Sequence, residues 1–227
     1  MNWFSSFLSS SIGKKIIMSL TGLFLMLFLV IHLVGNIQLL IPDQGEQFNI
    51  YAKTMTSNPL IQVVSIVTYF FILLHAVQGI LLWRKNLSAR NTRYAVASTS
   101  TTSFSSRNMG WLGIVIFIFL LIHMWQFWFQ MKFGSLELQV YKDYPDGIKD
   151  LYIPVAYAFK QWYFVLFYVV SMVILGYHLN HGFQSAFQSL GLNHKKYTPA
   201  IKTVGTAYSI LIPLGFAIIP IVFFFLR

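Results

Sequence analysis

Five long apolar stretches constrain the fold of this 227-residue chain more than any other feature. Each is long enough for a helix to cross about 30 Å of hydrocarbon, which takes about 20 residues. We place them at residues 16–40, 60–83, 109–131, 161–187 and 203–226. Only 10% of the residues are charged, too few to cover the outside of a soluble domain. The sequence therefore predicts a single all-α membrane domain over residues 1–227, with five transmembrane helices in a bundle.

The charged residues form two groups when they are assigned to the segments between these stretches. Ten basic residues fall on the side of the N-terminus: Lys14, Lys15, Arg84, Lys85, Arg90, Arg93, Arg107, Lys195, Lys196 and Lys202. The other side has six basic and six acidic residues, so the formal net charge of +10 lies on the N-terminal side. The positive-inside rule predicts a cytoplasmic N-terminus and a C-terminus outside. The basic residues either only orient the helices or also form a docking surface for a cytoplasmic partner.

Two connecting segments are long enough to have structure of their own. The inner segment, residues 86–108, contains a Ser/Thr run and predicts a flexible connector. The outer segment, residues 132–160, combines turn residues such as Pro145 and Gly147 with interfacial aromatic residues. It predicts a short cap on the outer surface.

The chain has no cysteine, which limits the redox chemistry open to it. Disulfides, thiolate-ligated iron–sulfur clusters and covalently attached c-type haem are all excluded. A metal must therefore be bound by histidine, methionine, carboxylate or carbonyl groups, and a haem must be held non-covalently.

Four of the five stretches carry a histidine deep inside them: His32, His75, His123 and His178. With a rise of 1.5 Å per residue, His32 and His123 lie about 21 Å from the inner end of their spans, and His75 and His178 about 12 to 14 Å. The four histidines thus form an outer and an inner layer. An imidazole in hydrocarbon is costly and is a good ligand for haem iron.

We therefore expect two b haems with bis-histidine ligation, the outer bound by His32 and His123 and the inner by His75 and His178. The alternative is that the histidines bond neighbouring helices or relay protons. Four small residues near the histidines would give a flat macrocycle room beside the helices: Gly22, Gly35, Gly79 and Gly182. His181, three residues after His178, competes with it for the ligand role.

Four sequence fragments, in order on successive helices, carry a family resemblance. They are Thr21-Gly22-Leu23-Phe24 with His32 eleven residues after Thr21, His75-Ala76-Val77-Gln78-Gly79, His123-Met124-Trp125, and His178-x-x-His181-Gly182 with Gly191. With these fragments the chain resembles the five-helix, di-haem cytochrome b subunits of succinate:quinone oxidoreductases, which include succinate dehydrogenases and quinol:fumarate reductases. The resemblance covers nearly the whole chain.

The resemblance implies the same haem pairings and selects His178 over His181, because the ligand lies four residues before Gly182 and thirteen before Gly191. It places Ser19 near a propionate of the inner haem, although an ordinary interfacial serine fits equally well. Some quinol:fumarate reductases of the family have a glutamate two residues before this ligand, where this chain has Gly176.

The resemblance also implies a function, a location and partners. The chain would be the membrane anchor in the inner membrane of a bacterium and would pass electrons between a cytoplasmic iron–sulfur subunit and quinone, usually menaquinone. A flavoprotein partner would carry out the interconversion of succinate and fumarate. Lipid surrounds such a subunit, and nucleic acid is not an expected partner.

The predicted quinone site lies in the outer half of the membrane, near the acidic face. The candidate residues follow the outer histidines along the chain: Asn36, Gln38, Trp125 and Gln126. Each could hydrogen-bond a quinone carbonyl, or could instead satisfy a helix end or bridge two helices. Glu46 is either a proton-exchanging group or an exposed loop acid.

Two other functions remain open at this stage. One is the cytochrome b of another quinone-linked enzyme, of the hydrogenase, formate dehydrogenase or cytochrome b561 type. The other is a haem-free transporter or proton channel whose histidines relay protons.

Overall fold

The computed structural model describes residues 2–88 and 104–227, and most of the connector predicted at 86–108 lies outside the described residues. The elements follow in the order α1 (Trp3–Ser9), α2 (Ser11–Ile37), η1 (Gln38–Leu40), α3 (Glu46–Ser57), α4 (Pro59–Ser88), α5 (Phe104–His123), η2 (Met124–Phe129), α6 (Gln130–Phe133), β1 (Leu138–Tyr141), β2 (Tyr144–Lys149), α7 (Tyr152–Phe159), α8 (Trp162–Ser189) and α9 (Thr198–Leu226). The described chain is therefore mostly helical, as predicted.

Five helices of the described chain are long and apolar enough to cross a membrane, which confirms the predicted number. They span Ser11–Leu40, Pro59–Ser88, Phe104–Phe133, Trp162–Ser189 and Thr198–Leu226. The predicted ranges were too short at the inner end of each helix. The helices continue by about one turn into polar sequence, because long side chains such as Lys14 can reach water from a helix whose body is in an apolar layer.

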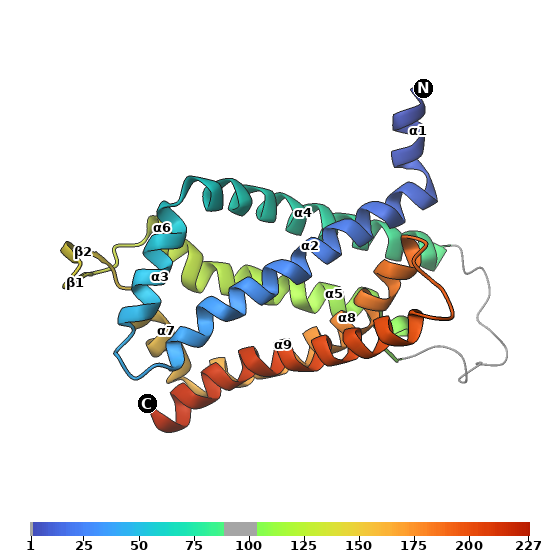
Figure 1. Cartoon of the computed structure of the whole chain (residues 1–227). Helices are drawn as coiled ribbons and strands as arrows, with labels where there is room; N and C mark the ends of the chain where they lie inside the picture. The colour runs from blue at the N-terminus through green and yellow to red at the C-terminus, as the bar shows by residue number, and fades with distance from the viewer. Residues whose placement is uncertain (1, 89–103) are drawn as a thin grey trace.

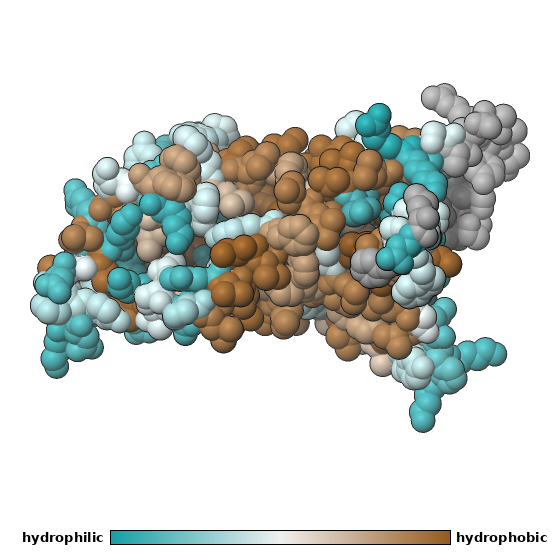
Figure 2. Space-filling model, turned by 90° about the horizontal axis from the view of Figure 1, so that it is seen from above, coloured by the Kyte–Doolittle hydropathy of each residue, from teal (hydrophilic) through white to brown (hydrophobic). Residues whose placement is uncertain are grey.

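The five long helices run along one direction, with the chain termini at opposite ends of the bundle (Figure 1). The end that holds α1 also holds the link between α8 and α9. The opposite end holds α3, the β-hairpin, α7 and the C-terminus. A belt of apolar side chains lies between two polar ends on the face seen in Figure 2. This distribution is what a multi-pass membrane protein requires.

The best-packed part of the bundle is formed by α2, α8 and α9. Its central cluster consists of buried residues from these three helices: Met26, Met172, Leu175, Leu179 and Ala217. Glycines permit the close approach of α8 and α9. A Cβ atom on Gly176 would lie 3.0 Å from the carbonyl oxygen of Ser209, and one on Gly205 would lie 2.7 Å from the Phe183 ring. The contact with Ser209 leaves no room for a glutamate side chain at position 176.

The end of the bundle that holds the C-terminus carries a larger cap than the sequence predicted. It comprises α3, the antiparallel hairpin of β1 and β2, and α7. Asn49 and Asp150, both buried, join these elements. The Asn49 amide donates to Asp150 Oδ1 (2.9 Å) and to Tyr141 Oη (3.0 Å), and its Oδ1 accepts from the backbone of Tyr152 (3.2 Å). Burial and the carboxylate of Asp150 raise the pKa of Tyr141, so its hydroxyl stays protonated.

Candidate functional site

The four histidines in the long helices form two pairs. In the inner layer the rings of His75 (α4) and His178 (α8) have centroids 6.3 Å apart and an interplanar angle of 69°. In the outer layer the rings of His32 (α2) and His123 (α5) are 5.9 Å apart at 88°. Both pairs are the ones expected from depth along the helices, and His178 rather than its neighbour His181 is the residue paired with His75.

The spacing of each pair suits a metal ion shared by two imidazoles. A metal–nitrogen bond of about 2 Å, with about 1 Å more from the nitrogen to the ring centre, separates two opposed rings by about 6 Å. Within the described residues there is no group of three or more His, Cys, Asp or Glu side chains that could hold a metal. Each pair therefore offers two ligands, the number that haem iron takes from a protein when the porphyrin supplies the other four.

The distance between the two histidine layers follows from the number of residues that separate them along α2 and along α8. On α2, Thr21 lies in the inner layer and His32 in the outer layer, eleven residues apart. On α8, Tyr168 lies in the outer layer and His178 in the inner layer, ten residues apart. At 1.5 Å per residue both helices give about 15 to 17 Å.

In the inner layer the ring of His75 is held from α2. Its Nδ1 lies 3.1 Å from the Thr21 hydroxyl, which is itself 2.8 Å from the carbonyl oxygen of Ile17. A Cβ atom on Gly22 would lie 3.2 Å from Cε1 of His75, so the glycine predicted to make room for a macrocycle makes room for this ring. By contrast, Nδ1 of His178 is buried and has no hydrogen-bond partner in the described structure.

In the outer layer the ring of His123 is held from α8. Its Nδ1 lies 3.3 Å from the hydroxyl of Tyr168, which donates to Oε1 of Gln126 at 2.7 Å. Aromatic rings stack on both histidines: Phe28 on His32 at 5.2 Å and Phe119 on His123 at 5.7 Å, centroid to centroid. The outer pair therefore lies in a largely aromatic, water-poor environment.

A six-residue π-helix, η2, follows His123 directly and was not predicted. Its residues Met124–Phe129 have no sequence pattern that distinguishes them from an α-helix. π-Helical turns accommodate an extra residue and are frequent at functional sites. Here the π-helix carries Gln126, the residue that accepts from Tyr168.

The four residues predicted for a quinone site have different environments. Asn36 donates to the carbonyl of His32 (2.7 Å), and its amide nitrogen lies 3.4 Å from Nδ1 of the same histidine. Gln126 bonds Tyr168. Gln38 is half-buried in η1, and Trp125 is exposed and stacks on Phe129. Only Asn36 and Gln126 thus lie beside the outer histidines in a hydrogen-bonded arrangement.

The remaining predicted residues mostly pack against other side chains. Gly35 lies against the ring of Tyr51, where a Cβ would be 2.5 Å from Cε1, so its small size serves the contact between α2 and α3. The nearest contacts of Cβ atoms on Gly79 and Gly182 would be the methyl groups of two methionines, Met18 at 3.0 Å and Met26 at 3.4 Å. Ser19 is buried and donates to the carbonyl of Lys15 (2.9 Å), and His181 is half-buried on α8.

Sequence reasoning assigned no histidine contact to Thr21, Tyr168 or Gly113, nor to the stacking rings Phe28 and Phe119. A Cβ on Gly113 would lie 3.8 Å from Cε1 of His178. Counted from the predicted inner ends at 1.5 Å per residue, Thr21 lies at about 8 Å and Tyr168 at about 29 Å, against about 12 Å for His75 and about 21 Å for His123, so depth did not match the hydroxyls to these rings. The depth argument considered histidines alone.

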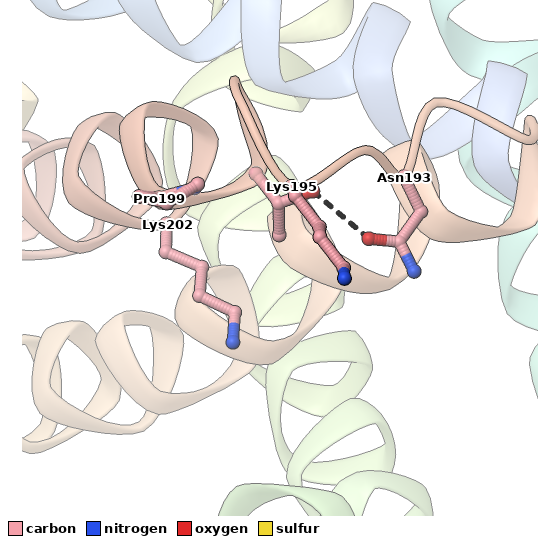
Figure 3. Close-up of a pocket in the computed structure, with 5 residues that line it drawn as sticks. Asn193, Lys195, Pro199 and Lys202 are labelled. Atoms are coloured by element: carbon pink, nitrogen blue, oxygen red, sulfur yellow. Dashed lines mark hydrogen bonds between the residues drawn. The ribbon is translucent and has the colours of Figure 1, made fainter.

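A cavity of about 400 Å³ lies at the inner end, lined by Asn193, Lys195, Thr198, Pro199 and Lys202. Figure 3 shows Lys195 and Lys202 extending from the α8–α9 link and from the start of α9. The polar groups between them bond each other, with Thr198 donating to Asn193 at 2.9 Å. This cavity belongs to the basic inner surface and is separate from the histidine layers.

Comparison of the chain with known protein families, with curated proteins and with solved structures finds no match in any of the three.

Proposed function

We propose that this chain is a di-haem cytochrome b, the membrane-anchor subunit of a succinate:quinone oxidoreductase. The observation that carries the proposal is the arrangement of the histidines. Each of four long helices contributes one imidazole, and the imidazoles form two pairs at 5.9 and 6.3 Å in two layers.

Haem accounts for these pairs better than a bare metal ion does. Structural zinc takes four protein ligands and catalytic zinc three, whereas each layer offers two imidazoles. The buried Nδ1 of His178, which has no hydrogen-bond partner in the described structure, and the aromatic rings stacked on the outer pair fit an apolar pocket.

When bound, haem would supply one-electron redox chemistry, with a potential set by its axial ligands and its burial. The role of the chain would be to hold one such group in each of the two histidine layers, which lie about 16 Å apart along the bundle, and to exclude water around it. His75 and His178 would hold the inner group, and His32 and His123 the outer group. The described long helices contain no acidic residue within their apolar parts, so the account needs no buried carboxylate.

The assignment to succinate:quinone oxidoreductases rests on the four sequence fragments around the histidines and on the five-helix architecture. In this proposal a flavoprotein and an iron–sulfur protein dock on the basic end of the bundle, which faces the cytoplasm of a bacterium. Quinone, menaquinone in the first instance, binds at the outer pair. The amide of Asn36 contacts His32, and that of Gln126 accepts from Tyr168, which contacts His123.

The experiment is a redox assay on the complex purified from membranes through a tag on the full chain. We expect a flavoprotein and an iron–sulfur protein in the preparation, haem bands that appear on adding succinate, and their loss on adding fumarate or a menaquinone analogue. Haem reduced by formate or hydrogen, and not by succinate, would assign the chain to another quinone-linked enzyme. A preparation without haem would overturn the cytochrome proposal altogether.

A further inference from the structure

The inner and outer histidine pairs share a hydrogen-bond pattern that no sequence motif predicted. In each layer one imidazole contacts a hydroxyl group, and that hydroxyl also contacts a carbonyl oxygen. The inner series runs from His75 Nδ1 to Thr21 Oγ1 (3.1 Å) to the Ile17 carbonyl (2.8 Å). The outer series runs from His123 Nδ1 to Tyr168 Oη (3.3 Å) to Gln126 Oε1 (2.7 Å).

The direction of these bonds follows from the number of available hydrogens. A hydroxyl has one hydrogen to donate, and a carbonyl oxygen has none. Thr21 Oγ1 lies within hydrogen-bond distance of two backbone carbonyl oxygens, those of Ile17 (2.8 Å) and Met18 (3.1 Å). Because neither carbonyl has a hydrogen, the hydroxyl of Thr21 must donate its single hydrogen to them and has none left to donate to His75. The hydroxyl must therefore accept from the imidazole. The same reasoning applies to Tyr168, which donates to Gln126.

An imidazole that donates from Nδ1 carries no hydrogen on Nε2 in its neutral form. The lone pair of Nε2 is then free for a metal. Outer-sphere acceptors of this kind fix the tautomer and the orientation of metal-bound histidines and increase the electron donation of the ring.

We propose that Thr21 and Tyr168 are positioning residues that hold His75 and His123 in the tautomer and orientation required to bind haem iron through Nε2. This inference rests on the proposed function, since it gives each proposed haem one hydrogen-bonded ligand. The two hydroxyls come from the well-packed helices α2 and α8, whereas the rings they hold come from α4 and α5. Among the described residues His178 has no such partner, and His32 has only the amide of Asn36, whose nitrogen lies 3.4 Å from its Nδ1 and 3.5 Å from its Nε2.

The test uses the full chain with Thr21→Val and Tyr168→Phe, each of which removes a hydroxyl and keeps most of the side-chain volume. Redox titration and electron paramagnetic resonance of the oxidised protein are the measurements. Each variant should raise the midpoint potential of one haem and leave that of the other unchanged. Without the hydroxyl as acceptor, the imidazole donates less electron density to the iron, and the ferric state is then less stabilised relative to the ferrous state. A tenfold change in that preference corresponds to about 59 mV for a one-electron couple. The ferric signal of the same haem should move as its ring rotates.

Two control variants match these changes. Thr68→Val removes a buried hydroxyl that bonds the Val64 carbonyl (2.8 Å), and Tyr208→Phe removes one that bonds the Met26 carbonyl (2.5 Å). Neither hydroxyl contacts a histidine in the described structure. We expect wild-type potentials and signals in both.

Thr21→Ser keeps the hydroxyl and should restore wild-type behaviour, which also addresses the case in which Thr21→Val does not fold. Unchanged potentials and signals in Thr21→Val and Tyr168→Phe, in protein that holds two haems, would overturn the inference and leave the proposed function standing. Equal shifts in the control variants, or a Thr21→Ser variant that behaves like Thr21→Val, would overturn it too. Wild-type protein without haem would instead overturn the proposed function.

Discussion

The two halves of the bundle differ in how much of each helix is buried within the chain. In the most apolar window of α9, 39% of the residues are buried, and in α2 and α8 28%, but in α4 and α5 only 6%. Helices α8 and α9 pack closely through Gly176 and Gly205. Thr68 is the buried residue of α4. Helices α2, α8 and α9 thus bury a larger share of their residues within the chain than the other two helices do.

The histidines are distributed across this division. Each pair joins a ring from the well-packed half, His32 or His178, to a ring from the sparsely packed half, His123 or His75. A haem bound between the rings would cross-link the two halves twice, once in each layer. With haem bound in both layers, the attachment of α4 and α5 would depend on the haems, whereas that of α9 would depend on side-chain packing.

The largest effect that we predict is that of haem depletion on α4 and α5. Protein produced under haem limitation should lose amide exchange protection in α4 and α5 and keep it in α8 and α9, because only the former depend on the proposed cross-links. Hydrogen exchange in detergent micelles, followed by mass spectrometry, measures this directly. Equal protection loss in all five helices would contradict the division into two halves.

A smaller effect is expected at Asn49, which joins α3 to the β-hairpin and to the start of α7 through hydrogen bonds. Replacement by alanine should lower the free energy of unfolding by about 3 kcal/mol, because it removes the amide that donates to Asp150 and Tyr141 and the oxygen that accepts from the backbone N–H of Leu151. Thermal unfolding of the purified protein is the measurement. Asn58→Ala, which changes an exposed asparagine at the other end of α3, is the control and should cost at most about 1 kcal/mol.

The same substitution, Gly→Ala, should have different effects in the two halves. Gly205→Ala would place a methyl group against the ring of Phe183 between α8 and α9 and should cost about 2 kcal/mol. In Gly113→Ala on α5, the new Cβ atom would lie 3.8 Å from Cε1 of His178, an ordinary contact distance. This variant should therefore be neutral, or more stable by up to about 1 kcal/mol because alanine has the higher helix propensity. Thermal unfolding of both variants side by side gives the answer. Similar destabilisation by both would mean that α5 is packed as tightly as α9.

The smallest effect is expected at Arg227, which donates to the carbonyls of Leu39 (2.5 Å) and Leu40 (2.6 Å) and lies over the ring of Phe223. These bonds satisfy carbonyl groups at the end of the first long helix. Arg227→Gln should lower the free energy of unfolding by about 1 kcal/mol. Arg227→Lys, which keeps the charge, should recover part of this loss in the same unfolding assay.

The sequence alone was sufficient for the five long helices and the two histidine pairs, because hydropathy and a fixed rise per residue determine both. It was insufficient where structure depends on contacts between distant segments. Helix α3 and the β-hairpin are stabilised by Asn49 and Asp150, which are 101 residues apart. The π-helix after His123 leaves no mark on hydropathy, and Gly35 was assigned to haem packing because nothing local indicated Tyr51 as its neighbour.

The account is tested most directly by haem quantitation on the purified chain and two of its variants. Pyridine haemochrome analysis should give about two b haems per wild-type chain, and about one each in His75→Ala and His123→Ala, with different haems lost in the two. Absence of haem from wild-type protein produced with ample haem would contradict the central claim, as would full haem content in both variants.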